Sequence, residues 1–230
     1  MGQPDQVGNP DLRPQTAWGI DIGVEQQIAN GSGLLGLNGF WRTIDNLIES
    51  QLSQDPISGR FLQRPVNIGS ARTYGVELDG RSELDFIGLP GLTLLGNVSW
   101  LNSAVDDITT GETRPFNEQP AYLFNLGFDY TLPSNAFSVG LNYRYVPQIA
   151  FTQQSGDILQ ERFVEPEGTL DGYLTWRPID TLALTLYGRN LLGIENSRPR
   201  RVLENGVLQS TQTDFQRADR IIGLNLSWQF

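Results

Sequence analysis

The 230-residue chain contains no cysteine and no histidine, and it has a single methionine. These absences exclude disulfide bonds, zinc fingers, c-type haem attachment, Ser-His-Asp triads and Cys/His dyads. With 16 Lys and Arg against 26 Asp and Glu, the net charge is −10, so the chain offers no basic surplus for binding a nucleic-acid backbone. No carboxylate pair stands in a context that favours acid–base catalysis. We therefore expect that the protein is not an enzyme and that it has no cofactor, no metal site and no nucleic-acid partner.

The chain also lacks any run of about 18 consecutive apolar residues, which excludes a transmembrane helix. The mean hydropathy of −0.28 is typical of a soluble protein. A membrane β-barrel has a similar average, because only alternate residues of each strand face lipid. Low hydropathy therefore leaves both possibilities open.

Apolar residues alternate with small or polar residues along most of the chain, which is the period of a β-strand with one apolar face. The pattern is clearest at the end, where every even position from Ile222 to Phe230 is apolar. It predicts nine strands, near residues 16–29, 34–48, 62–85, 91–105, 122–132, 137–145, 163–177, 181–191 and 222–230.

The connections between these strands alternate between short and long. Short connections at 30–31, 89–91, 132–135 and 178–180 contain the Pro, Gly, Asn and Asp residues of tight turns. Long polar segments, expected to be loops, fill 49–61, 106–118, 152–162 and 192–216. Outer-membrane barrels have short periplasmic turns and long extracellular loops. The sequence thus predicts an all-β fold, an antiparallel transmembrane β-barrel portion of about nine strands.

Aromatic residues lie near the ends of the apolar runs, as they do in the interfacial girdles of membrane barrels. They include Tyr122, Phe124, Phe128, Tyr130, Trp176, Trp228 and Phe230. A soluble β-sandwich remains the alternative, in which the same aromatics form a core between two sheets.

Three stretches of the sequence resemble motifs of one protein family. The segment Asn9-Pro10-Asp11-Leu12-Arg13-Pro14-Gln15 is similar to an Asn-Pro-Asp-Leu-Lys-Pro-Glu segment that precedes a barrel strand. Residues 67–77 resemble an Asn-x-Gly-x-Ala-x-x-x-Gly-Val-Glu strand. Residues 190–193, Asn-Leu-Leu-Gly, resemble an Asn-Leu-Phe-Asp element, with departures at Leu192 and Gly193. In this order the three motifs resemble those of TonB-dependent outer-membrane receptors.

The resemblance implies a receptor in the bacterial outer membrane that imports a scarce ligand, by default a ferric siderophore. Residues 1–230 would be the C-terminal part of its barrel, without the plug domain and the earlier strands. The implied partners are the TonB complex, acting through the absent plug, the membrane lipid and a small-molecule ligand. A terminal strand that contains Trp228 and ends at Phe230 resembles the signal for the barrel-assembly machinery.

The odd number of predicted strands is a separate reason to expect that the barrel is incomplete. Nine antiparallel strands leave the first and the last running in the same direction, whereas bacterial single-chain barrels have even strand numbers. We therefore expect an open, curved sheet that needs further strands.

Candidate ligand contacts are Arg198, Arg200 and Arg201 in the longest loop, which could attract an anionic ligand or simply pair with acids. The residues expected to face the lumen are Asn97, Asn125, Asp129, Asn142 and Arg144. Asp106, Asp107 and Glu112 are expected to lie in a solvated loop. The functional alternatives are a passive porin-like barrel and a soluble all-β binding or adhesion module.

Overall fold

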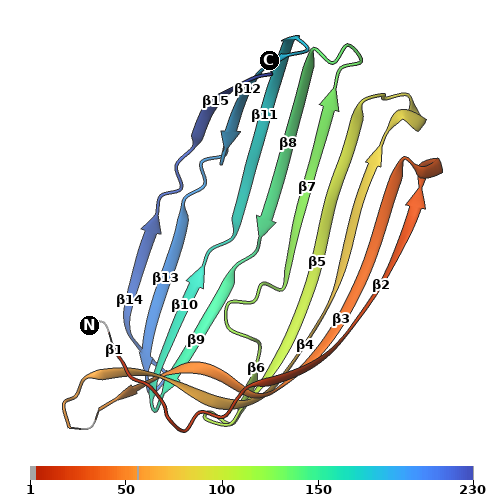
Figure 1. The fold of residues 1–230 in the computed structure, drawn as a ribbon. Coiled ribbons are helices and arrows are strands. Elements are labelled where there is room, and N and C mark those ends of the chain that lie inside the picture. The colour runs from red at the N-terminus through yellow and green to blue at the C-terminus, as the bar shows by residue number, and fades with distance from the viewer. Residues whose placement is uncertain (1–3, 56, 230) are drawn as a thin grey trace.

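The computed structural model describes residues 4–55 and 57–229, which form two β-sheets joined at one end (Figure 1). The larger sheet follows the order β15-β12-β11-β8-β7-β5-β4-β3-β2, with β1 paired to β4 and β6 paired to β5. The smaller sheet has the order β14-β13-β10-β9. No helix within the described ranges has the length and apolar character needed to cross a bilayer.

The strands of the larger sheet are β1 (Asp5–Gln6), β2 (Thr16–Ile28), β3 (Gly33–Gln54), β4 (Phe61–Glu83), β5 (Leu92–Asp107), β6 (Glu112–Arg114), β7 (Tyr122–Thr131), β8 (Phe137–Val146), β11 (Glu167–Ile179), β12 (Leu182–Arg189) and β15 (Ile221–Trp228). The smaller sheet contains β9 (Ile149–Ser155), β10 (Ile158–Val164), β13 (Asn196–Glu204) and β14 (Val207–Gln216). Two single-turn 3-10 helices, η1 (Ala29–Gly31) and η2 (Asp85–Ile87), lie in short turns.

The main path of the larger sheet contains the nine predicted strands in the predicted order. All pairings along this path are antiparallel. The short turns lie together at one end and the long connections at the other (Figure 1). The two outermost strands, β2 and β15, lie at opposite edges of an open, curved wall. The predicted all-β, antiparallel and unclosed architecture is therefore confirmed.

The long segments are not the loops that the sequence predicted. Strands β3 and β4 continue into 49–61, β6 lies within 106–118, β9 and β10 meet in 152–162, and β13 and β14 occupy most of 192–216. The predicted strand 163–177 is also wrong at its start, because Val164 ends β10 and Glu167 begins β11. These hairpins extend beyond the apolar wall, so they have no continuous apolar face to give a period-two signal.

The nine-strand wall has one apolar face and one polar face. Opposite residues in the register share a face, so Leu186 lies beside Leu224 while Thr185 lies beside Asn225. Leu126 is 61% exposed and Leu224 is 69% exposed, and no second layer of described residues covers that face. A sandwich core between two sheets is therefore absent from residues 4–55 and 57–229, and the aromatic residues line an uncovered wall.

A small core lies at the end of the wall where the long hairpins begin. Its buried members are Leu47, Ile68, Ala71 and Val105, with Ile44, Val66 and Phe116 packed around them. The strands bend here through register shifts between Ile44 and Ile48. Gly69 has φ of +132°, and a Cβ at this position would lie 2.1 Å from the Asp106 carbonyl oxygen. Only glycine fits this bend.

Two of the segments that resemble the receptor family lie against each other. The Asn67 Nδ2 donates to the carbonyl oxygens of Arg13 (3.0 Å) and Asn46 (2.8 Å), and its Oδ1 accepts from the Arg13 amide at 2.8 Å. The Gln15 side chain accepts from the Ile48 amide at 3.0 Å. Segment 9–15 is therefore fastened along the bend between β3 and β4.

Replacing Asn67 by alanine should release segment 9–15, because three hydrogen bonds are lost. We expect local opening to become easier by about 2 kcal/mol, a factor of about 30. Thermolysin cleavage of the Asp11–Leu12 bond measures this opening, because cleavage follows the population of the open form. Asn102→Ala is the matched control, with an expected change under about 0.5 kcal/mol. Equal cleavage rates in both variants would contradict this role of Asn67.

Candidate functional site

The five residues predicted to face the lumen all lie on the polar face. Asn97 and Asn125 are opposite each other on β5 and β7, and the Asn125 Nδ2 donates to the Asn97 Oδ1 at 2.8 Å. Asp129 accepts a 2.7 Å hydrogen bond from the Tyr173 hydroxyl across β8. Asn142 and Arg144 on β8 are in register with Gly127 and Asn125. The positions agree with the expected face, and contact with a ligand or a plug stays a prediction.

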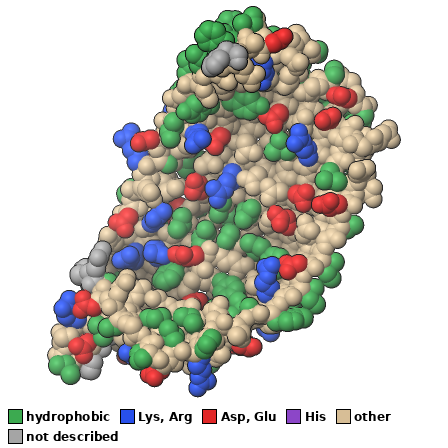
Figure 2. Space-filling model, in the orientation of Figure 1, with side chains coloured by type: hydrophobic (Ala, Val, Ile, Leu, Met, Phe, Trp, Pro, Cys, Tyr) green, Lys and Arg blue, Asp and Glu red, His purple; other side chains and the backbone are tan. Residues whose placement is uncertain are grey.

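Further polar pairs bridge strands on the same face. Arg42 Nη2 and Asp21 Oδ1 form an ion pair at 2.7 Å between β3 and β2. Arg177 Nη1 donates to the Ser138 Oγ at 2.8 Å. Figure 2 shows acidic and basic side chains spread over one face of the molecule, many beside a partner of opposite charge. Such a surface is suited to contact with water or with a polar domain rather than with lipid.

Aromatic rings on the apolar face mark a boundary at the end of the wall where the long hairpins begin. Trp41 and Tyr74 stack at 5.2 Å between ring centroids, and Tyr74 meets Trp100 edge-on at 6.0 Å. Two more neighbours, Phe124 and Tyr145, stack at 5.4 Å on β7 and β8. This band is typical of side chains at a membrane–water interface, so the hairpins beyond it project into water.

The three candidate arginines do not come together. Arg200 on β13 lines a cavity between the two sheets, whereas Arg198, on the same face of the strand, does not. Arg201 points to the opposite face, where its guanidinium lies 5.4 Å from the Phe163 ring centroid. The three arginines therefore do not share one surface, because Arg201 is on the face of β13 opposite to Arg198 and Arg200, and contact of any of them with a ligand stays a prediction.

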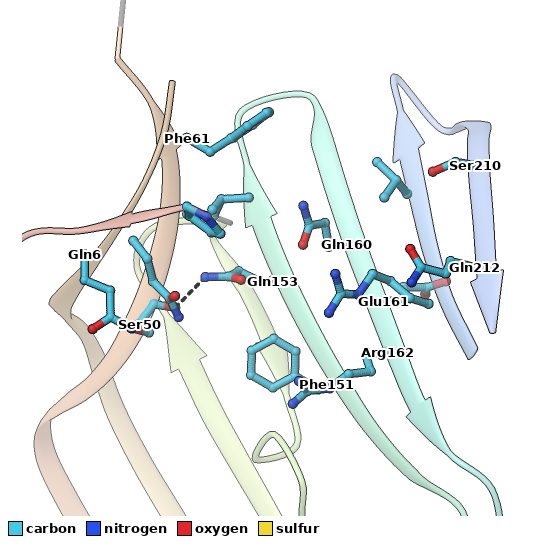
Figure 3. A pocket seen from close by; sticks show the side chains of 15 residues that line it. Gln6, Ser50, Phe61, Phe151, Gln153, Gln160, Glu161, Arg162, Ser210 and Gln212 are labelled. Carbon is cyan, nitrogen blue, oxygen red and sulfur yellow. Dashed lines mark hydrogen bonds between the residues drawn. The ribbon is translucent and has the colours of Figure 1, made fainter. Parts of the chain in front are cut away.

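The cavity lies among the long hairpins and has a volume of about 630 Å³. One wall comes from β1, β3 and β4, and contributes Pro4, Gln6, Ser50, Leu52, Phe61 and Gln63. The other wall comes from the smaller sheet, and contributes Phe151, Gln153, Gln160, Glu161, Arg162, Arg200, Val202, Ser210 and Gln212. Figure 3 shows Gln6 and Ser50 on one side, Gln160 and Gln212 on the other, and Gln153 between them. A volume of this size suits a small-molecule ligand.

Hydrogen bonds between the sheets fix the width of the cavity. The Gln153 Nε2 donates to the Ser50 carbonyl oxygen at 2.8 Å. Asn117 exchanges two hydrogen bonds with the Thr152 backbone, at 2.8 and 3.1 Å, and also donates to the Glu49 carboxylate at 3.0 Å. The outer part of β3 is therefore tied to β9, although the two are about a hundred residues apart in sequence.

An ion network supports the base of this arrangement. The Arg114 Nη2 lies 2.7 Å from the Glu49 Oε2 and 3.1 Å from the Asp107 Oδ2. Burial of Asp107 on its own would raise its pKa, but hydrogen bonds from Thr109 and Arg114 outweigh it, and the pKa lies below its ordinary value. Asp107 is only 5% exposed, so the expectation of a solvated position is wrong for this residue.

The glutamine-rich lining of the cavity could not be found from the sequence. Gln6, Gln63, Gln153, Gln160 and Gln212 come from five different strands, and no motif connects them. All residues of β14 are exposed, so its polar sequence shows no apolar period and resembles a loop. Among the described residues, no group of acidic side chains is arranged as a metal site.

Trp228, one of the two residues of the predicted assembly signal, lies on the last strand of the wall. Trp228 pairs with Leu182 at the edge of the wall and is 67% exposed. Phe230 lies outside the described residues. The role of these two residues in assembly stays a prediction.

These features define the class of protein as a section of an outer-membrane β-barrel. A sequence model of the family described as "TonB dependent receptor-like, beta-barrel" matches residues 2–191. The chain belongs to this family of receptors and transporters, which is not an enzyme family, and its location is the outer membrane of Gram-negative bacteria. No curated protein matches the sequence.

Solved structures show the same fold. The FrpB iron transporter from Neisseria meningitidis is 18% identical, with a TM-score of 0.60 over 96% of this chain and 32% of that chain. The siderophore receptor PirA from Acinetobacter baumannii is 15% identical, with a TM-score of 0.61 over 98% and 33%. The pyoverdine receptor FpvA from Pseudomonas aeruginosa is 15% identical, with a TM-score of 0.61 over 95% and 30%. This chain thus spans about a third of each receptor's length.

Proposed function

We propose that residues 1–230 form the C-terminal part of a receptor barrel that captures a ferric siderophore and takes it up with energy from the TonB complex. The observation that carries this proposal is the cavity at the water-exposed end, which lies among the long hairpins beyond the membrane wall. The similarity to an iron transporter and to receptors for siderophores supports the choice of ligand.

The proposal assigns the other partners by position. The apolar face, with Leu126 and Leu224 exposed, would contact membrane lipid. The polar face, including Asn97 and Asp129, would face a plug domain that contacts TonB. The open edges at β2 and β15 would pair with the remaining strands of the barrel, because unpaired backbone groups in hydrocarbon cost several kcal/mol each. Trp228 and Phe230 would present the last strand to the assembly machinery.

Uptake of radiolabelled ferric chelates by iron-starved cells tests this function. Cells that express the receptor containing residues 1–230 should accumulate iron from at least one ferric siderophore, and deletion of TonB should abolish the uptake. A passive porin would instead give uptake independent of TonB, together with swelling of receptor-containing liposomes in small sugars. Uptake that persists without TonB would therefore overturn the proposal.

A further inference from the structure

The lining of the cavity is rich in uncharged amides. Gln6, Gln63, Gln153, Gln160 and Gln212 all contribute to it. Two of these amides are already engaged, since Gln153 donates to the Ser50 carbonyl oxygen at 2.8 Å and Gln212 donates to the Asp214 Oδ1 at 2.9 Å. Within the described ranges, the side chains of Gln6, Gln63 and Gln160 have no hydrogen-bond partner. Each of the three offers both donors and an acceptor to a ligand.

The cavity lining offers few charges that are free to meet a ligand. Arg162 is paired with Glu118, and its guanidinium lies 4.7 Å from the Phe151 ring centroid. The Glu161 side chain points away from the cavity, because Glu161 is in register with Arg201 on the opposite face of the smaller sheet, whereas Arg200 adds a positive charge to the lining. Arg200 has no ion pair or side-chain hydrogen bond with any described residue, so it is the cation that remains for a ligand. One such arginine cannot neutralise a ligand with several negative charges.

Apolar groups complete the lining. Leu52 is 4% exposed and Val202 is 7% exposed, and they lie on opposite walls. The Phe61 and Phe151 rings line the same space (Figure 3). Such a mixture suits a molecule whose short apolar links alternate with amide or hydroxyl groups. A strongly anionic chelate would lose its hydration in the cavity without enough cations to replace it.

We propose that the cavity binds a ferric chelate of low net charge with amide and hydroxyl groups on its surface, of the peptide-hydroxamate type, in preference to a trianionic tris-catecholate chelate. This inference rests on the proposed function and specifies its substrate class. Gln6, Gln63 and Gln160 would exchange hydrogen bonds with the amides of the chelate, and Arg200 would bind a single anionic or carbonyl oxygen.

Competition binding to outer-membrane vesicles that carry the receptor tests the preference. The probes are a neutral ferric tris-hydroxamate with a peptide backbone and a ferric tris-catecholate with three negative charges. We expect the neutral chelate to bind at least about tenfold more tightly, because the negative charges of the tris-catecholate would remain unpaired in the cavity. Tighter binding of the tris-catecholate would overturn the inference and leave the proposed function standing. Binding of neither chelate, together with TonB-dependent uptake of another ferric chelate, would also overturn the inference alone.

Single substitutions locate the binding in this cavity. Gln63→Ala and Gln160→Ala should each weaken binding of the neutral chelate by about three- to tenfold, since each removes hydrogen bonds to the ligand. Gln154→Ala and Arg201→Ala are matched controls, because both side chains point away from the cavity, and they should bind within twofold of the unmodified receptor. Equal losses of affinity in the variants and the controls, or no loss of affinity in either, would overturn the assignment of the chelate to this cavity. Heat-modifiable migration of every variant verifies that its barrel is folded.

Discussion

Replacing Leu224 by arginine should deplete the receptor from the outer membrane, whereas the same replacement at Asn225 should leave it there. The two residues are neighbours on β15 and point to opposite faces of the wall. Leu224 is 69% exposed on the apolar face. An arginine facing lipid near the middle of a bilayer costs about 2–4 kcal/mol, whereas one that faces the lumen keeps its hydration.

Comparing these two variants distinguishes a sheet that faces lipid from a sheet of a soluble protein. The amount of heat-modifiable receptor in purified outer membranes gives the readout, with total expression as the reference. A cost of 2–4 kcal/mol lowers the equilibrium constant for folding into the membrane by about 30- to 1000-fold. If both variants accumulate equally, the apolar face does not contact lipid. If Asn225→Arg is the more damaging change, the assignment of the two faces is reversed.

The nine wall strands could be predicted from sequence because lipid imposes a strict alternation. In β15, each of Ile222, Leu224, Leu226 and Trp228 lies on the apolar face, and the residues between them lie on the other. Turn positions were equally clear, since Asn30 and Asn135 adopt positive φ in short turns. The two-residue turn at Asn205-Gly206, also with positive φ, forms the hairpin that these residues favour.

The hairpins in water could not be predicted in the same way. Both faces of β14 are exposed, so a sequence such as Gln209-Ser-Thr-Gln-Thr213 has no apolar period and resembles a loop. Their pairing depends on contacts that are distant in sequence, including Gln153 with Ser50. The cavity has the same origin, because its lining comes from strands whose order in space differs from their order in the chain.

Charge alone was also a poor guide to the site. Three arginines in the longest segment could have attracted an anion or paired with acids, but among the described residues that line the cavity Arg200 is the arginine without a partner. Asp107 belongs to a run of acids that resembles a solvated loop, yet hydrogen bonds from Thr109 and Arg114 hold it in a buried position. The sequence shows the number of charges, whereas the register of the strands decides which of them meet.

Replacing Arg114 by methionine should open the base of the cavity. The substitution leaves Glu49 (19% exposed) and Asp107 (5% exposed) without their shared cation. Removing one partner from a buried ion network costs about 3 kcal/mol or more, because the remaining charge stays out of water. Arg60→Met is the matched control, since Arg60 forms an ion pair of similar length (2.8 Å) with Asp5, but both side chains are largely exposed. The control should cost less than about 1 kcal/mol.

Hydrogen exchange measures the opening at two amides that the network positions. The Phe116 amide donates to the Ser103 Oγ at 2.9 Å, and the Thr152 amide donates to the Asn117 Oδ1 at 2.8 Å. In Arg114→Met both should exchange about 100-fold faster, the equivalent of about 3 kcal/mol. The Leu126 amide in the wall serves as an internal reference and should not change. Faster exchange at Leu126 would mean that the whole barrel is destabilised, and unchanged exchange at Phe116 and Thr152 would show that the β3–β4 hairpin keeps its contact with β9 without the arginine.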